Sequence, residues 1–174
     1  MNKKRVVGLT LVVLVLLGVV AVLAGPSRSG SNGPLKFTVR MSKRAYAPGE
    51  LVTIHTKLTN ISKSPIAVFR PGHYSDHCII DGGADLIARN NSVKSMRGPE
   101  ARDIVILAPR ASLSFTHRMD ATGAVGPLLG AGVHTLSGEY DTTSIFIMPN
   151  KRNPSPPRFW KGKIKTPSLT FTIL

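Results

Sequence analysis

One stretch of strict alternation, Leu51 to Asn60, constrains the fold of this chain more than any other feature. A Pro48-Gly49 turn precedes it, and turn-forming residues follow it up to Pro65. Successive side chains on a β-strand point to opposite faces, so this pattern predicts a strand with one dry face and one wet face. The dry set is Val52, Ile54, Thr56 and Leu58, and the wet set is Thr53, His55, Lys57 and Thr59.

Similar short stretches follow one another through the rest of the chain. Thirteen prolines and sixteen glycines supply the turns between them. Asp81-Gly82-Gly83 separates two such stretches and tolerates the positive φ angles of a tight hairpin, so we expect its flanking strands to pair. The pattern predicts an all-β fold, an antiparallel β-sandwich of about seven to nine strands over residues 35–174. Besides 51–60, the expected strands are 35–41, 65–70, 76–80, 84–89, 103–107, 112–119, 133–140 and 163–174.

The N-terminus indicates the compartment. A basic head, Met1 to Arg5, precedes nineteen uncharged residues, Val6 to Ala24, which as a helix would span about 28 Å. Positive charge at the start keeps that end in the cytoplasm and the remainder outside. Residues 1–24 are predicted to be a signal anchor. The alternative is a signal peptide cut after Val22-Leu23-Ala24, which would release the domain. Residues 25–34 are predicted to be a flexible linker.

The charge balance and the single cysteine narrow the possible partners and chemistry. The net charge is +14. Without Lys3, Lys4 and Arg5, twenty basic and nine acidic residues leave +11. Such a surface would attract an anionic envelope component such as lipid or cell-wall polymer, and nucleic acid is not expected outside the cell. The alternative, which we favour, is that an exported protein is simply basic. Cys78 cannot form an intramolecular disulfide, and its apolar neighbours indicate a buried thiol.

Several turn and strand-edge motifs carry a family resemblance. They are Pro48-Gly49-Glu50, Leu58-Thr-Asn60 before a turn, Asp76 with Asp81-Gly82, Gly132-Val-His134, and Trp160-Lys-Gly162. With them, residues 35–174 resemble the bacterial immunoglobulin-like domains of the BsuPI type, the intracellular proteinase inhibitors. The resemblance implies an immunoglobulin-like sandwich and, as one alternative, an inhibitor. His134 departs from it, because many such domains have a corner tyrosine there.

The densest group of potential metal ligands is His73, Asp76, His77 and Cys78. Imidazole, carboxylate and thiolate all suit a zinc-like ion. His73 and His77 are four residues apart, which aligns ligands on a helix, whereas Pro71-Gly72 argues against a helix here. We therefore favour a loop that enters a strand, with His77 exposed and Cys78 buried.

The sequence lacks the motifs of the common catalytic sites. No Gly-x-Ser-x-Gly, His-Glu-x-x-His or phosphate-loop pattern is present, and the nine acidic residues are scattered. His55 falls on a wet face, while His117 and His134 fall in the inward phase of their strands. We expect neither an enzyme nor a bound cofactor.

A basic segment with two aromatic residues runs from Met148 to Lys165, and no acidic residue follows Asp141. It could contact an anionic surface or a protein partner, or its cations could be merely solvated with Trp160 packed beneath the last strand. The candidate partner-binding residues are Lys151, Arg152, Arg158, Phe159, Trp160 and Lys161. The sequence thus favours a membrane-tethered or exported, non-enzymatic binding or scaffolding domain of the cell envelope. A proteinase inhibitor is the alternative.

Overall fold

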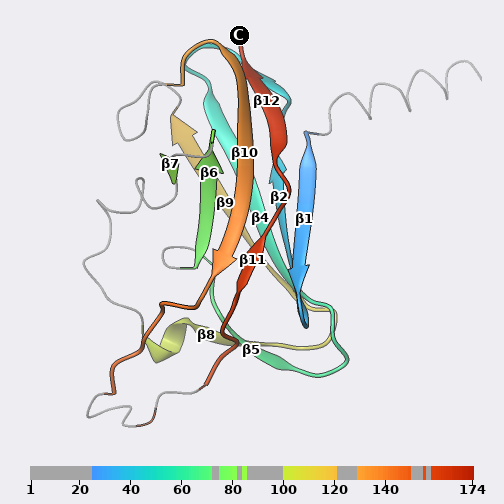
Figure 1. The fold of residues 1–174 in the computed structure, drawn as a ribbon, viewed down its shortest axis with the longest axis vertical. Helices are drawn as coiled ribbons and strands as arrows, with labels where there is room; N and C mark the ends of the chain where they lie inside the picture. Colours follow the sequence, from blue (N-terminus) through green and yellow to red (C-terminus); the bar gives the residue numbers. More distant parts are fainter. Residues whose placement is uncertain are drawn as a thin grey trace, which may run out of the picture.

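A computed structural model describes residues 25–71, 75–81, 84–85, 100–120, 129–149, 155 and 158–174 of the chain (Figure 1). The regular secondary structure of these residues consists of β-strands, apart from one short 3₁₀ turn at Ala101–Asp103. The strands are β1 (Ser27–Asn32), β2 (Leu35–Met41), β3 (Ala45–Tyr46), β4 (Leu51–Asn60), β5 (Ile66–Phe69), β6 (Asp76–Ile80), β7 (Ala84–Asp85), β8 (Ile104–Leu107), β9 (Ser112–Asp120), β10 (Gly132–Asp141), β11 (Lys163–Lys165) and β12 (Leu169–Ile173).

The strands form two main sheets and one small one. The first sheet has the order β1-β2-β4-β9, and all its neighbours are antiparallel. The second has the order β3-β12-β10-β6-β7, with β11 also paired to β10. Its neighbours are antiparallel except for the short parallel pair β3 and β12. β5 and β8 form a separate antiparallel ribbon at the lower end in Figure 1.

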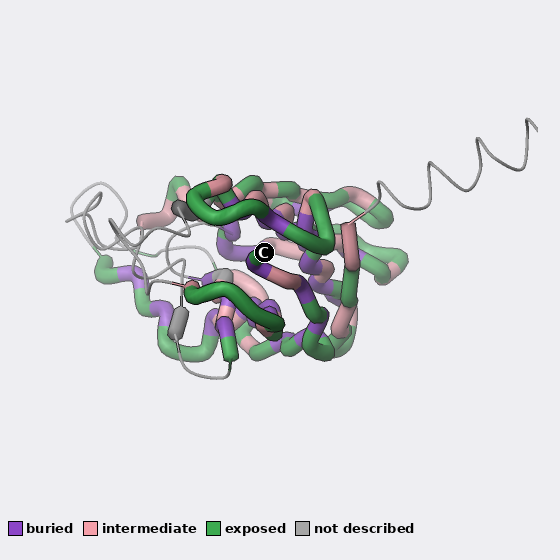
Figure 2. Tube along the Cα trace, turned by 90° about the horizontal axis from the view of Figure 1, so that it is seen from above, coloured by how far each residue is buried: buried purple, intermediate pink, exposed green. Residues whose placement is uncertain are grey.

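The core lies between the two main sheets. Buried residues concentrate between the two layers of strands (Figure 2), because each strand turns alternate side chains toward the opposite sheet. Phe37 of β2 packs against Tyr140 of β10, with ring centroids 5.9 Å apart. Gly138 allows the sheets to approach closely there, since a β-carbon at this position would lie 2.0 Å from Cγ2 of Val39. The predicted all-β architecture of layered antiparallel sheets is confirmed.

The strand pattern agrees with the structure at most positions. The alternation in Leu51–Asn60 is confirmed, with Val52, Ile54, Thr56 and Leu58 all buried. The hairpin between β6 and β7 is also confirmed, and Asp81 in its turn has a φ of 48°. The predicted last strand differs, because 163–174 divides into β11 and β12.

Residues 25–34 are not the flexible linker that their composition suggested. Ser27–Asn32 form β1, which pairs with β2 over six residues. Gly30 packs directly on β11, because an added β-carbon would lie 2.1 Å from the carbonyl oxygen of Lys165. A Gly- and Ser-rich composition indicates flexibility only when no strand edge is available to pair with, and β2 supplies that edge.

The predicted signal anchor, residues 1–24, lies outside the described residues. Within the described ranges, no helical segment combines the length and the hydrophobicity that a membrane span needs.

Candidate functional site

The predicted partner-binding segment lies beside the β5–β8 ribbon. Lys151 and Arg152 are outside the described residues, whereas Arg158 is exposed. Phe159 is half-buried against Phe69 of β5, with ring centroids 5.6 Å apart. The ammonium of Lys161 lies 4.5 Å from the centroid of the Phe159 ring and donates a hydrogen bond to the Ile145 carbonyl.

Trp160 packs against the sandwich rather than standing free. Its ring stacks on Tyr140, with centroids 5.8 Å apart, and its backbone N–H donates to the Ala67 carbonyl at 2.8 Å. Its own carbonyl accepts a hydrogen bond from the Thr142 hydroxyl at 2.9 Å. These contacts join the segment to β5 and β10, so Trp160 holds the segment in place while Arg158 and Lys161 face solvent.

The neighbouring segment 144–149 exposes two large apolar side chains that the sequence analysis did not single out. Ile145 and Ile147 are buried in a small cluster with Phe69, and Ile104 and Phe159 pack against it. Between and beyond them, Phe146 and Met148 are 67% and 73% exposed. We call residues 144–149 together with 158–161 the apolar end. From the sequence alone, the four apolar residues Ile-Phe-Ile-Met would all be expected in the core. The structure shows that buried and exposed side chains alternate along them.

The four candidate metal ligands do not form one set. Cys78 is a buried member of the main core, whereas His77 is half-buried at the preceding position of β6. Consecutive strand residues point to opposite faces, so these two side chains cannot bind the same ion. His73 and the side chain of Asp76 lie outside the described residues. In the described portion of the chain, no three His, Cys, Asp or Glu side chains cluster as metal ligands do.

The histidines have separate environments. His117 is half-buried, and its Nε2 lies 3.4 Å from the hydroxyl of Thr56. His134 lies 2.8 Å from Asp81 through Nδ1 and 2.8 Å from the Gly130 carbonyl through Nε2. Because both ring nitrogens contact acceptors, His134 is not placed to act as a base toward a nucleophile.

The wet face of the first sheet is a regular array of hydroxyls and cations. The registers of β1, β2, β4 and β9 place twelve side chains on this surface in three rows of four. We call it the hydroxyl–cation face. Its rows are Ser31, Lys36, Thr59 and Ser112; Ser29, Thr38, Lys57 and Ser114; and Ser27, Arg40, His55 and Thr116.

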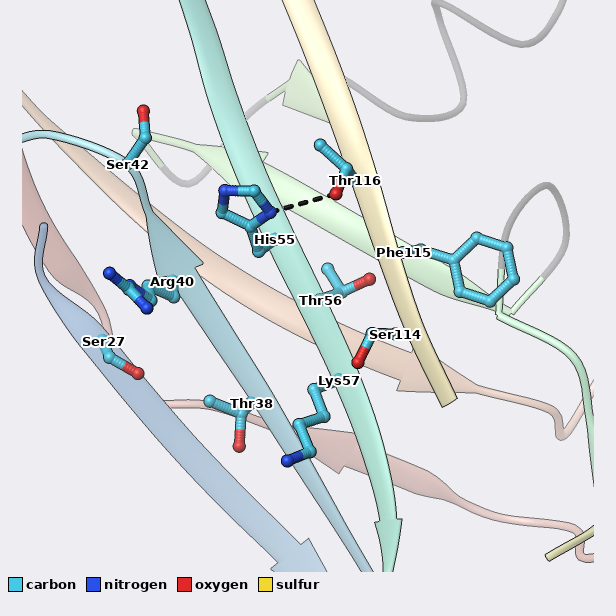
Figure 3. A pocket seen from close by; sticks show the side chains of 10 residues that line it. All are labelled: Ser27, Thr38, Arg40, Ser42, His55, Thr56, Lys57, Ser114, Phe115 and Thr116. Atoms are coloured by element: carbon cyan, nitrogen blue, oxygen red, sulfur yellow. Dashed lines mark hydrogen bonds between the residues drawn. The ribbon is translucent and has the colours of Figure 1, made fainter. Parts of the chain in front are cut away.

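A shallow groove crosses the second and third rows (Figure 3). Arg40 and Lys57 line it, and in the same row as Arg40 the His55 Nδ1 lies 3.0 Å from the Thr116 hydroxyl. Phe115 also lines the groove in part, but its ring points away from these polar groups in Figure 3. None of the twelve residues of the face is acidic, and none is Phe, Tyr or Trp. Such a surface can donate many hydrogen bonds to a negatively charged ligand.

The sequence alone predicts only part of the hydroxyl–cation face. Alternation in β4 predicted that His55 and Lys57 lie on a wet surface. It could not show that Ser27 and Arg40 lie in the same row, because cross-strand register depends on pairing between distant segments.

Two comparisons of the sequence with known proteins identify no relative. A scan against models of protein families finds no match to the chain, and a search among curated proteins finds no significantly similar sequence. Function is therefore inferred from the chemistry and geometry of these residues.

Proposed function

We propose that this chain is a non-enzymatic binding domain of the cell envelope, with an immunoglobulin-like sandwich, that contacts a protein partner through its apolar end. Residues 1–24 would anchor it in the membrane with the sandwich on the extracytoplasmic side, or would be cleaved to release it. The supporting observation is the pair of exposed side chains Phe146 and Met148. Large apolar groups exposed side by side are characteristic of contact surfaces, and Phe and Met are enriched in interface cores.

The apolar end packs against the body of the domain. The buried side chains of Ile145 and Ile147 fix the backbone on the inner side, and Lys161 donates a hydrogen bond to the Ile145 carbonyl. Such preorganisation lowers the entropy lost on association. The neighbouring Arg158 and Lys161 would add charge at the rim, where it steers encounter more than it strengthens binding.

The position of the apolar end also suits a tethered domain. β1 starts at the upper end of the sandwich, and the β5–β8 ribbon beside the apolar end lies at the lower end (Figure 1). A membrane segment preceding residue 25 would therefore attach opposite the apolar end and leave it directed outward.

Site-specific photo-crosslinking in the cells that make the protein tests this function. A photoreactive residue replacing Phe146 should give one discrete crosslinked product in the membrane fraction, and Met148→Ser in the same chain should reduce it. The control replaces Thr170, an exposed residue of β12. Full-length protein in the soluble cytoplasmic fraction, or equal crosslinking from positions 146 and 170, would contradict the proposal.

A proteinase inhibitor is the second candidate. Residues 145–148 lie outside the strands and expose the side chain of Phe146 to solvent. Proteases bind substrates with one side chain in a specificity pocket, and a hydrophobic slot would accept phenylalanine. A panel of serine and metalloproteases tests it. Absence of inhibition at micromolar concentrations of the protein would argue strongly against this candidate.

A further inference from the structure

The hydroxyl–cation face has the composition of an anion-binding surface. It holds Lys36, Arg40 and Lys57, the imidazole of His55, and eight hydroxyl groups, with no carboxylate among its twelve residues. The three cations therefore reinforce one another in a positive field above the sheet. We propose that this face binds an extended anionic polymer made of polyol units joined by phosphodiester bonds.

The three cations are arranged for a linear ligand. Lys36, Lys57 and Arg40 occupy successive rows and alternate between β2 and β4. Residues in such diagonal positions have Cα atoms about 7–8 Å apart. A polyol phosphate carries one negative charge per short repeat, so an extended chain running along the strands can present successive phosphates to successive cations.

The hydroxyl groups fit the rest of such a polymer. Ser27, Thr38 and Ser114 line the groove next to Arg40 and Lys57 (Figure 3). A serine or threonine hydroxyl can donate to a phosphate oxygen and can accept from a polyol hydroxyl. The face therefore offers partners for both the charged and the neutral parts of each repeat.

The same composition argues against other polyanions. Proteins that bind single-stranded nucleic acid stack the bases on aromatic side chains, and none of the twelve residues is Phe, Tyr or Trp. Binding to an anionic membrane surface usually adds apolar side chains that enter the lipid, and this face presents none. A polymer with phosphates and hydroxyls but no bases or acyl chains matches the face best.

This inference is independent of the proposed function. The hydroxyl–cation face belongs to β1, β2, β4 and β9, whereas the apolar end packs against β5 and β10. Loss of one binding activity would leave the other intact.

Titration of the full chain, purified in a neutral detergent, with a synthetic glycerol phosphate oligomer tests the proposal. Arg40→Gln/Lys57→Gln should weaken binding at least about tenfold and should reduce the slope of log K against log salt by about 1.4, since each phosphate contact contributes about 0.7 in a single-stranded polyanion. Lys63→Gln/Lys165→Gln is the matched control. It removes the same charge from exposed residues off the face and should change the affinity less than threefold.

Further ligands and variants separate specific binding from general charge attraction. Ser114→Ala and Thr38→Val keep the charge and should each weaken binding measurably, since each removes a hydroxyl that lines the groove. Equal losses in the two double variants would overturn the proposal. So would tighter binding of an oligothymidylate or of anionic vesicles than of the oligomer, or absence of binding at millimolar oligomer.

Discussion

The imidazole of His134 joins the Asp81 carboxylate to the Gly130 carbonyl, with both ring nitrogens at 2.8 Å from their acceptors. The other oxygen of Asp81 accepts from the backbone N–H of Thr135 at 2.7 Å. The hydrogen bond between the two side chains is the main reason that the pKa of His134 is raised and that of Asp81 is lowered. The hydrogen bonds of His134 through both ring nitrogens therefore depend on its protonation.

This pair predicts a pH-dependent stability. Because folding raises the pKa of His134, this histidine contributes stability that is fully present below its unfolded pKa of about 6.5. The contribution is lost as the pH rises through its folded pKa. The lowered pKa of Asp81 gives stability present above about pH 3.9 and lost as pH falls through its folded value. The contribution should therefore be largest from about pH 4 to pH 6.5. Because Asp81 is about half-exposed, we expect only about 0.5–1 kcal/mol.

Urea denaturation at pH 5.5 and pH 8.5 measures the effect. The difference in free energy of unfolding between the wild type and His134→Gln should shrink at the higher pH, since the variant cannot form the imidazolium. The other four histidines are present in both proteins, so their titration does not contribute to this difference. An equal difference at both pH values would show that the pKa of His134 is the same in the folded and the unfolded protein, which would contradict the prediction.

Substitution of Asn60 alone should cause a large loss of stability. Its side chain is fully buried, and Nδ2 donates to the carbonyls of Ser64, Leu107 and Ala108 while Oδ1 accepts from Ser62. Asn60→Ala removes all of these hydrogen bonds from a buried position and should cost about 3 kcal/mol. The exposed Asn32, with one bond to the Lys163 carbonyl, is the control, and Asn32→Ala should cost less than about 1 kcal/mol. Equal midpoints of thermal unfolding for the two variants would contradict this.

The sequence predicted what depends on local periodicity and missed what depends on long-range pairing. The two-residue alternation of Leu51–Asn60 was sufficient to identify β4 and its buried face. The serines of β1 gave no such signal, since only their pairing with β2 makes them a strand. Phe146 likewise became visible only once Ile145 and Ile147 were seen to face inward against Phe69.

The assignment of β1 to the sheet predicts that Gly30 cannot be enlarged. Gly30→Val would force a side chain into the carbonyl of Lys165 on β11, and overpacking of this kind costs about 1–3 kcal/mol. Ser31→Val on the same strand points to solvent and should be nearly neutral. Urea denaturation of both variants provides the measurement. If 25–34 were a linker in solution, both would leave the free energy of unfolding unchanged.

Alanine substitutions of Trp160 and Phe146 should affect different properties. Trp160 holds the apolar end in place, so its loss should lower stability, whereas Phe146 is exposed on the apolar end, so its loss should affect partner contact. Trp160→Ala removes the stacking on Tyr140 and should destabilise the fold by about 2 kcal/mol, less than a fully buried tryptophan would. Phe146→Ala removes an exposed ring and should change stability by no more than about 0.5 kcal/mol, while it abolishes partner contact. Denaturation curves and crosslinking yields separate the two effects. A Trp160→Ala protein with wild-type stability would show that the ring is a contact residue rather than part of the packed sandwich.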